Sequence, residues 1–274
     1  MFSVVIPTKN EAANLARCLD ALRDVDEIIV VDSGSTDATC DIARGRGAKV
    51  VDFRWDGGFP KKRNWVLRNV PLRHPWVLFL DADEVVSEAF LDEVRRTLPA
   101  TTHEGFWLSF TNYFLGKRLE HGDPFRKLAL FRVGAGEYER IDEKQWSHLD
   151  MEVHEHPVLR GTVGEIESPI EHNDFKGLFA YVQRHNEYST WEARRYLALM
   201  ESGQEKWAEL TPRQKRKYEN LRKVWFPLGY FFATYVLKRG ALDGGVGLAF
   251  SLHKAFYFYQ VQLKIAELER SGAR

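Results

Sequence analysis

Residues 78–86 read LFLDADEVV, an apolar strand that runs directly into three carboxylates. The carboxylates belong to Asp81, Asp83 and Glu84. Like charges this close together repel one another, and burying them is unfavourable by several kcal/mol unless a partner compensates. The stretch therefore predicts either a solvated acidic loop or a site that holds a cation.

Strands and helices are expected to alternate through the first hundred residues. Apolar runs predict strands at 2–7, 27–32, 48–53 and 76–80. Helical spacing and capping residues predict helices at 11–23, 60–69 and 87–98. Ser87 is expected to cap the last of these, and Ser35 or Thr36 to cap a helix after the second strand, with Asp37 in its first turn. This alternation predicts an α/β fold with a parallel, doubly wound sheet that is covered on both faces.

The pattern changes after residue 100. Residues 105–115 and 127–133 are expected to form strands of a mixed or antiparallel extension of the sheet. A polar, poorly periodic segment follows at 134–157. From about residue 175 the chain is expected to be helical to its end.

Composition narrows the class of protein. The 274 residues carry a formal net charge of zero, so no nucleic-acid partner is expected. The two cysteines, Cys18 and Cys40, lie in no metal-ligand spacing, which disfavours a zinc site or a disulfide framework. The first residues show no basic segment before a long apolar core, so we expect no signal peptide and a cytoplasmic location.

Ligands of open parallel sheets bind beyond the carboxyl ends of the strands. Three predicted strands end in polar groups, at 7–11, 32–37 and 81–84, and these ends are expected to meet at one edge of the sheet. Neither the dinucleotide fingerprint GxGxxG nor the P-loop pattern follows the first strand. An enzyme that uses a nicotinamide cofactor or hydrolyses ATP is therefore disfavoured.

Four motifs occur in order within residues 1–100: VVIPTKNEAANL, IIVVDSGSTDAT, KKRNWVL and VLFLDADE. Together they resemble the nucleotide-sugar domain of glycosyltransferase family 2, which has the inverting GT-A fold. The later segments VHEHP, GTVGEI, IEHNDF and YVLKRGALDGGVG are similar to a narrower group. That group contains the lipopolysaccharide-core β-1,4-glucosyltransferases and related bacterial surface-glycan enzymes.

The resemblance implies a GT-A domain, which is a doubly wound, Rossmann-like mixed sheet, followed by a C-terminal amphipathic helical region. It divides the chain into three parts. Residues 1–100 would form the nucleotide-sugar-binding half of the GT-A domain, and residues 101–174 its acceptor and catalytic half. Residues 175–274 would form a helical region that meets a membrane surface or makes an oligomer interface.

The resemblance also implies how the donor, a UDP-sugar, is held. Asp32 would hydrogen-bond the base, Arg63 would reach a phosphate, and Asp81 would contact the ribose or a metal-bound water. The other residues expected near the donor are Pro7, Thr8, Asn10, Glu11 and Asn64. Asp83 is the candidate ligand of a divalent cation, Mg²⁺ or Mn²⁺, because these ions prefer carboxylate oxygens and keep open positions for phosphate. Turn formation or helix capping is the alternative for Asp32, and a cap alone is expected of Asp37.

Transfer to a sugar hydroxyl also needs a general base within hydrogen-bond reach of the acceptor. Glu155 is the first candidate, because VHE matches the narrower group, and Asp150 and Glu152 are alternatives. The histidines on either side of Glu155 would assist it or serve the structure. His172 would contact a phosphate or a metal ion, or else have a structural role.

The C-terminal third contains apolar runs at 224–237, 244–252 and 255–259, all shorter than the ~20 residues that span a bilayer. Bases gather in 213–223, just before the first run. Amphipathic helices with basic flanks and aromatic side chains suit the surface of an anionic membrane. Glycines within 240–247 predict a turn between two such helices. A cover for the catalytic domain or a homo-oligomer interface is the alternative for the same helices.

These observations predict a metal-dependent, inverting glycosyltransferase. It would move a hexose, glucose from UDP-glucose, to a lipid-linked or lipopolysaccharide-core saccharide. It would work as a peripheral enzyme on the inner face of the cytoplasmic membrane. Two alternatives stay open: a transferase whose acceptor is a polyprenyl phosphate, and a nucleotide-sugar-binding scaffold without activity.

Overall fold

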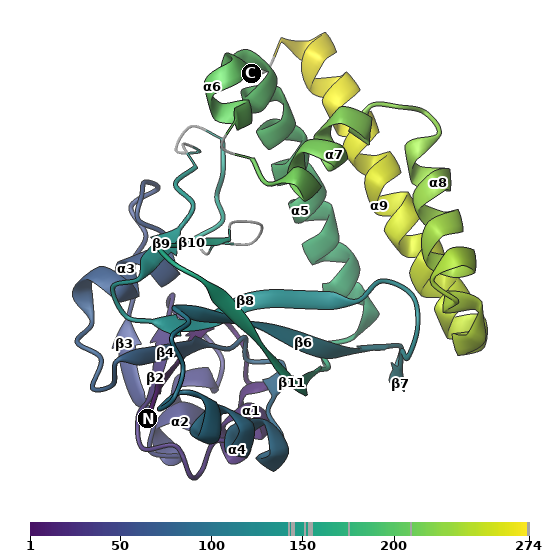
Figure 1. The fold of residues 1–274 in the computed structure, drawn as a ribbon. Helices are drawn as coiled ribbons and strands as arrows, with labels where there is room; N and C mark the ends of the chain where they lie inside the picture. The colour runs from purple at the N-terminus through teal and green to yellow at the C-terminus, as the bar shows by residue number, and fades with distance from the viewer. Residues whose placement is uncertain are drawn as a thin grey trace. The chain divides into compact units, whose positions relative to one another are not determined.

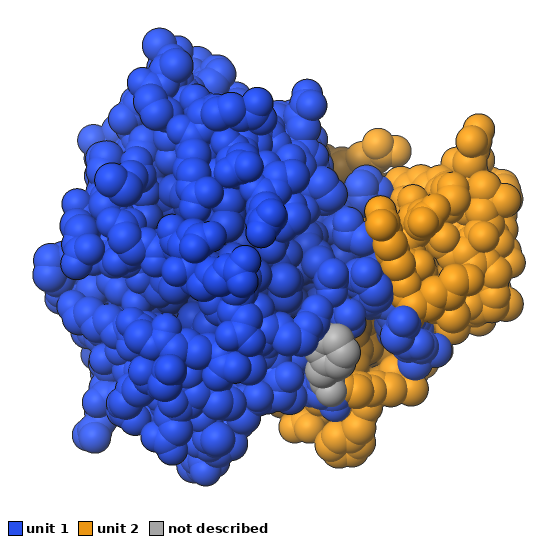
Figure 2. Space-filling view, turned by 90° about the horizontal axis from the view of Figure 1, so that it is seen from below, with its two compact units in different colours: residues 1–116, 124–176 blue, residues 117–123, 177–274 orange. Residues whose placement is uncertain are grey.

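The computed structural model describes residues 1–141, 143, 146–150, 152, 156–174, 176–208 and 210–272, and Figure 1 shows its elements. The chain forms two compact units, which are coloured separately in Figure 2. Unit 1 comprises residues 1–116 and 124–176. Unit 2 comprises residues 117–123 and 177–274, so it takes one short segment from the middle of the sequence.

Unit 1 is built on a mixed sheet with the strand order β3-β2-β1-β4-β8-β6-β11-β5. The bounds of these strands are β1 Ser3–Thr8, β2 Ile28–Asp32, β3 Lys49–Asp52, β4 Trp76–Phe79, β5 Glu84–Val85, β6 Gly105–Phe114, β8 Phe125–Arg132 and β11 Val163–His172. β1 pairs in parallel with β2 and β4, and β2 in parallel with β3. β8 runs antiparallel to β4 and β6, whereas β11 is parallel to β6 and antiparallel to β5. The predicted parallel sheet with a mixed extension is confirmed.

The remaining elements of unit 1 are short. β9 (Gly136–Tyr138) and β10 (Pro157–Leu159) form a separate antiparallel ribbon. The helices are α1 Leu15–Asp20, α2 Thr39–Gly45, α3 Lys62–Asn69 and α4 Glu88–Thr97. α1, α2 and α4 gather on one side of the sheet, below it in Figure 1, whereas α3 contacts β9. As predicted, Ser87 caps α4, because its Oγ accepts a hydrogen bond from Phe90 N (3.1 Å).

Two helix starts differ from the prediction. α1 begins at Leu15 rather than at residue 11, and residues 12–14 form a turn before it. The N–H groups of Glu11 and Ala12 donate to Thr39 Oγ1 (2.7 Å) and Asp37 Oδ2 (3.1 Å). α2 begins only at Thr39, so Ser35 and Thr36 do not cap it and Asp37 lies before its first turn. Asp37 itself accepts from Thr39 N (3.0 Å), as a cap does.

The core of unit 1 follows from the apolar strands. The side chains of Val4, Val5 and Ile6 in β1 are completely buried, as are Ile29 and Val30 in β2. Burying one such side chain contributes roughly 1.5–3 kcal/mol relative to leaving it in water. Continuous burial along β1 and β2 shows that both faces of this half of the sheet are covered, as parallel strands require.

Unit 2 is helical, as predicted for the chain beyond about residue 175. Its helices are α5 Gly177–Glu201, α6 Gly203–Ala208, α7 Pro212–Leu221, α8 Phe226–Phe232 and α9 Gly244–Ser271. A π-helical turn (η1, Ala233–Leu237) and a 3-10 turn (η2, Gly240–Asp243) join α8 to α9, and the two-residue strand β7 (Lys117–Arg118) lies in the inserted segment. α5 and α8 both pack against α9 (Figure 1). Nothing in the described part of the chain forms a helix long and apolar enough to cross a bilayer.

Candidate active site

The carboxyl ends of β1, β2 and β4 lie at one edge of the sheet, because β1 pairs in parallel with both neighbours. Asn10 links the segment after β1 to the segment after β2. Its backbone N–H donates to Ser35 Oγ (2.8 Å), and its Oδ1 accepts from Thr36 N (2.8 Å). It does so from a left-handed backbone conformation, with φ 56°, which asparagine adopts more readily than most residues. The predicted convergence of the strand ends is confirmed.

Asp32 ends β2 with only 2% of its surface exposed. Its carboxylate accepts hydrogen bonds from Thr8 Oγ1 (3.0 Å), Ser35 N (2.7 Å) and Ser35 Oγ (2.5 Å). Burial raises the pKa of Asp32, but the hydrogen bonds from Ser35 and Thr8 outweigh burial and lower that pKa below its usual value. The Cys40 thiol also donates to Asp32, and because a thiol is a weak donor, an incoming N–H can replace it on the ionised carboxylate.

Lys62 connects the end of β1 to a candidate base. Its ammonium group is buried, donates to Thr8 O (3.1 Å) and lies 3.3 Å from Asp150 Oδ2. Burial lowers the pKa of Lys62, and the charge of Asp150 acts in the opposite direction. Sequence analysis missed this residue, although it stands in the KKRNWVL motif directly before Arg63.

Two cationic side chains form ion pairs with the acidic residues that follow β4. Arg63 Nη2 lies 2.6 Å from Asp81 Oδ1, and Lys127 Nζ contacts both Asp81 and Glu84. Burial raises the pKa of Asp81, but Lys127 and Arg63 outweigh burial and hold that pKa well below its usual range. Glu84 is fully buried, and burial raises its pKa to about 7 although Lys127 opposes the change. The stretch is therefore not the solvated acidic loop that was one of the two predictions.

Asp83 has a histidine as a close neighbour. His172 ends β11 with its Nε2 3.4 Å from Asp83 Oδ2, and its Nδ1 lies 3.1 Å from Asn112 Oδ1. Because an amide oxygen can only accept, Nδ1 carries a proton. Burial lowers the pKa of His172, but the charge of Asp83 outweighs burial and raises that pKa. The lone pairs of Nε2 and of the carboxylate thus face each other, and a proton or another cation must lie between them.

This pair fits a divalent metal ion that bridges a diphosphate. Carboxylate oxygens suit Mg²⁺ and Mn²⁺, and neutral imidazole is the commonest metal-binding side chain. Within the described residues, no group of three or more His, Cys, Asp or Glu side chains could hold a metal ion. An ion held by Asp83 and His172 would therefore complete its coordination with phosphate oxygens and water, as Mg²⁺ commonly does.

Arg63 and Asn64 have partners within the protein. Arg63 reaches Asp81, so its contact with a phosphate stays a prediction. Asn64 is fully buried, its Nδ2 donates to Tyr138 O (3.0 Å), and its Oδ1 accepts from Tyr138 N (2.8 Å). These two hydrogen bonds join α3 to β9 and favour a structural role for Asn64.

Two further residues predicted near the donor lie in or directly after β1. Pro7 is buried within the strand. Glu11 contacts Lys176 (2.5 Å) and Asn14 (3.1 Å) just beyond its end. Burial raises the pKa of Glu11, while Lys176 acts to lower it. Both residues lie at the predicted edge of the sheet, and their contact with a nucleoside stays a prediction.

Two of the three candidates for the general base, Asp150 and Glu152, are among the described residues. Glu155, the first candidate, lies outside the described residues. Asp150 is described, and its carboxylate lies beside Lys62 as stated above. Glu152 is buried, and its two carboxylate oxygens accept from Arg63 N (2.9 Å) and Asn64 N (3.1 Å) at the start of α3. Its carboxylate is thus committed to the helix, which disfavours Glu152 as the base.

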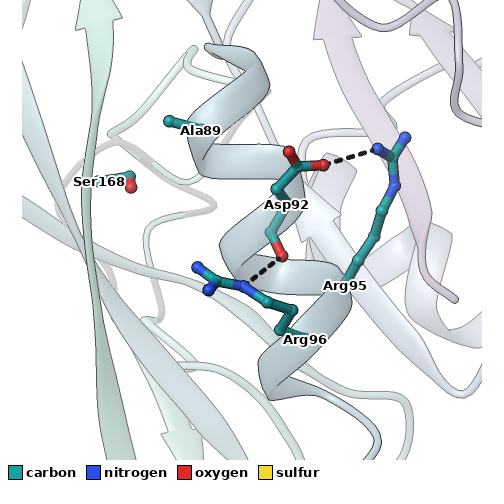
Figure 3. Close-up of a pocket in the computed structure, with 5 residues that line it drawn as sticks. All are labelled: Ala89, Asp92, Arg95, Arg96 and Ser168. Atoms are coloured by element: carbon teal, nitrogen blue, oxygen red, sulfur yellow. Dashed lines mark hydrogen bonds and ion pairs between the residues drawn. The ribbon is translucent and has the colours of Figure 1, made fainter.

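A surface hollow on α4 contains none of the predicted site residues (Figure 3). It is lined by Ala89, Asp92, Arg95, Arg96 and Ser168. In Figure 3 the charged side chains along it bond to their own helix: Asp92 pairs with Arg95 (3.2 Å), and Arg96 Nε donates to Asp92 O (3.3 Å). The hollow therefore adds no residue to the candidate site.

Comparison with known proteins identifies the family of the chain. The model of glycosyl transferase family 2 matches residues 3–155, which is more than half of the chain. The chain therefore belongs to this family and is a glycosyltransferase. Its mixed sheet, with polar strand ends at one edge, is the GT-A fold of the family. The matched range includes Asp32, Asp81 and Asp83.

Three similar proteins match different shares of the chain. An uncharacterized glycosyltransferase of Rickettsia felis is 27% identical over 98% of this chain and 89% of its own length. The lipopolysaccharide core biosynthesis glycosyltransferase LpsC of Rhizobium meliloti is 28% identical over 70% of each chain. A crystal structure of glucosyl-3-phosphoglycerate synthase from Mycobacterium tuberculosis, in complex with Mg²⁺ and UDP, is 28% identical with a TM-score of 0.32. That match spans 42% of this chain and 44% of the synthase.

Proposed function

We propose that this glycosyltransferase transfers a hexose, glucose from UDP-glucose, with inversion to a saccharide of lipopolysaccharide or another cell-surface glycan. The proposal rests on the carboxyl ends of β2 and β4, which are separated in the sheet only by β1. The end of β2 presents Asp32 as an ionised acceptor. The end of β4 leads to Asp83, which is paired with His172 of β11. The similarity to LpsC, which is named for lipopolysaccharide core biosynthesis, supports the class of acceptor.

Different residues of the chain would bind the nucleobase and the diphosphate of the donor. Asp32, held by Thr8 and Ser35, would accept a hydrogen bond from an N–H of the uracil base. Asp83 and His172 would hold a divalent cation, whose positive charge stabilises the departing nucleoside diphosphate. Arg63 and Lys127 fix Asp81 beside this pair, where Asp81 would contact the ribose or a water on the cation.

The transfer also requires a proton acceptor on the side of the sugar opposite to the leaving group. Glu155 is the first candidate for this role and Asp150 the second. Lys62 lies 3.3 Å from the Asp150 carboxylate and donates to Thr8 O, so it keeps that carboxylate near the end of β1. An inverting transferase needs one such base, because the acceptor hydroxyl attacks the sugar in a single displacement.

Release of nucleotide from a panel of sugar nucleotides tests the proposal. We expect UDP release from UDP-glucose with Mg²⁺ or Mn²⁺ and none with EDTA. Asp83→Asn is expected to lower the metal-dependent rate by about tenfold or more, since loss of even an indirect metal contact has an effect of this size. Asp92→Asn is a matched control on the exposed face of α4 and is expected to behave as the wild type.

The outcomes separate the parts of the proposal. Unchanged metal-dependent release by Asp83→Asn, in a protein that still melts as the wild type does, would reject Asp83 as the metal ligand. Release from another sugar nucleotide but not from UDP-glucose would reject glucose. Absence of both release and calorimetric binding across the panel would reject the proposed class of donor.

A further inference from the structure

The helices α8 and α9 form a hairpin that depends on two glycines. A Cβ atom added at Gly240 would lie 2.8 Å from Thr234 O, and one at Gly247 would lie 2.0 Å from Gly240 O. Both distances are shorter than a real Cβ contact, so only glycine permits the chain to turn back here. α8 consequently runs beside α9, as Figure 1 shows and as the predicted glycine turn implies.

α9 has one buried face and one exposed apolar stripe. Ala255, Val261 and Ile265 are buried on the side that packs within unit 2. Large apolar side chains with a spacing of three or four residues are exposed on another side: Leu248, Leu252, Phe256, Tyr259 and Leu263. Half of the surface of Phe256 is exposed, at 52%. This spacing places the five side chains in a single line along the helix.

A second line of exposed apolar side chains runs along the α8 side of the hairpin. Trp225, Leu228, Phe232 and Val236 are separated by three or four residues, and all are exposed, Leu228 by 73%. We call these four side chains and the five of α9 the hairpin stripe. Nine large apolar side chains exposed on two packed helices are unusual for a monomeric soluble protein, so the stripe indicates a surface that another body covers.

The charges around the stripe identify the kind of partner. Residues 222–266 contain six Lys or Arg and a single acid, Asp243. Asp243 is 5% exposed and accepts hydrogen bonds from the backbone N–H groups of Glu120 (3.2 Å) and His121 (3.0 Å). The exposed bases at the two ends of α8 are Arg222, Lys223, Lys238 and Arg239. Arg222 pairs with Glu269 (2.8 Å) and Lys238 with Asp123 (2.5 Å). Lys223 and Arg239 thus present exposed positive charge beside the stripe, whereas the exposed acids of α9, Glu267 and Glu269, follow its last apolar residue, Leu263.

This charge pattern disfavours a second copy as the partner. In a symmetric dimer the same surface meets itself, so bases of one stripe would face bases of the other. The exposed acids of α9, Glu267 and Glu269, lie beyond the stripe, and Glu269 is already paired with Arg222. Phosphate groups of lipids would neutralise these bases, and acyl chains would cover the apolar side chains.

We propose that the hairpin stripe is a docking surface for an anionic bilayer. Leu and Phe side chains of α8 and α9 would enter the boundary between headgroups and acyl chains. Trp225 and Tyr259 carry a ring with one polar atom, which suits the headgroup level. Lys223 and Arg239 would contact lipid phosphates. The chemistry of the surface carries this proposal independently of the proposed function.

Co-sedimentation of the full chain with vesicles tests the proposal. We expect binding to phosphatidylglycerol-containing vesicles, weaker binding to pure phosphatidylcholine vesicles, and a loss of this difference in about 1 M salt, where the Debye length is ~3 Å. The double variant Phe232→Ser/Phe256→Ser is expected to lower the affinity at least about tenfold, because two apolar rings no longer leave water. Phe179→Ser, at an exposed phenylalanine of α5 outside the stripe, is the matched control and is expected to bind as the wild type does.

A second pair of variants tests the charges separately. Lys223→Gln with Arg239→Asn is expected to abolish the preference for anionic vesicles, whereas Lys49→Gln with Arg54→Asn removes the same charge from exposed positions of unit 1 and should preserve it. Equal binding to neutral and anionic vesicles by the wild type would overturn the proposal. A dimer in ultracentrifugation that Phe232→Ser/Phe256→Ser dissociates, without vesicle binding, would overturn it in favour of a second copy.

Discussion

At the scale of single residues, the charge balance after β4 depends on side chains that are distant in the sequence. Arg63 comes from α3, Lys127 from β8 and His172 from β11, and each faces a carboxylate of residues 81–84. Asn112 in β6 has the less visible role of fixing the proton on His172 Nδ1. An amide that sets the tautomer of a metal-binding histidine affects the metal without touching it.

Replacement of this amide tests the metal site at residue scale. Asn112→Ala is expected to raise the Mn²⁺ concentration needed for half-maximal UDP release about 10- to 100-fold, because His172 loses the acceptor that orients it. The metal titration is measured at saturating UDP-glucose. Thr111→Ser changes the residue that precedes Asn112 in β6. The side chain of this residue points to the opposite face of the sheet, so the substitution should leave the titration unaltered. An identical titration for Asn112→Ala would contradict the proposed role of His172.

At the scale of elements, α3 begins on acceptors supplied by a segment almost ninety residues later. Lys62 N donates to Asp150 O (3.0 Å), and the next two N–H groups donate to the carboxylate of Glu152. The first N–H groups of a helix have no partner within the helix, and a carboxylate there is also favoured by the helix dipole. Asp150 and Glu152 therefore cap α3.

Removal of this cap is expected to destabilise unit 1. Glu152→Ala leaves two buried N–H groups without an acceptor, and the free energy of unfolding should fall by about 2–4 kcal/mol. Glu152→Gln keeps one carbonyl acceptor and should have a smaller effect. Urea unfolding followed by circular dichroism measures both, with the exposed Glu167→Ala as a control that changes stability by about 0.5 kcal/mol at most. Equal stability of Glu152→Ala and wild type would show that the cap is dispensable.

At the scale of the whole molecule, the two units have separate hydrophobic cores. The core of unit 1 is made by residues of β1, β2, β4 and their neighbours, and the core of unit 2 by residues of α5, α7 and α9. The predicted donor contacts all belong to unit 1. A ligand that binds only the folded form stabilises it by about 2.7 kcal/mol at a concentration of 100 Kd.

Hydrogen exchange can locate this stabilisation. UDP with Mn²⁺ is expected to slow exchange in peptides that cover β1, β2 and β4 and to leave peptides of α9 unchanged. UDP with EDTA is the control, and protection of β4 should then be lost. Equal protection of α9 would contradict the expectation and show that the two cores open together.

The elements and the donor-site residues were predictable to different extents. The strands β1 to β4, β6 and β8 follow local apolar runs, so their positions were predicted within about two residues. The strands β5, β9, β10 and β11 were not predicted, because they are short or lack a continuous apolar run. The predicted start of α1 was wrong: residues 11 and 12 are held by Thr39 and Asp37, side chains 28 and 25 residues away that no local pattern reveals. Lys127 gave no usable signal, since a lysine at the start of an apolar strand is expected to be solvated.

The sequence by itself determined the family, the positions of the parallel strands and the three polar strand ends, because apolar period, capping residues and motif order are local properties. The tertiary structure decided which cation compensates which carboxylate. The pairing of β8 with β4 brings Lys127 to Asp81, and the pairing of β11 with β5 and β6 brings His172 between Asp83 and Asn112. No local period encodes which distant strands pair, so the partners of the acidic stretch appear only when the sheet is complete.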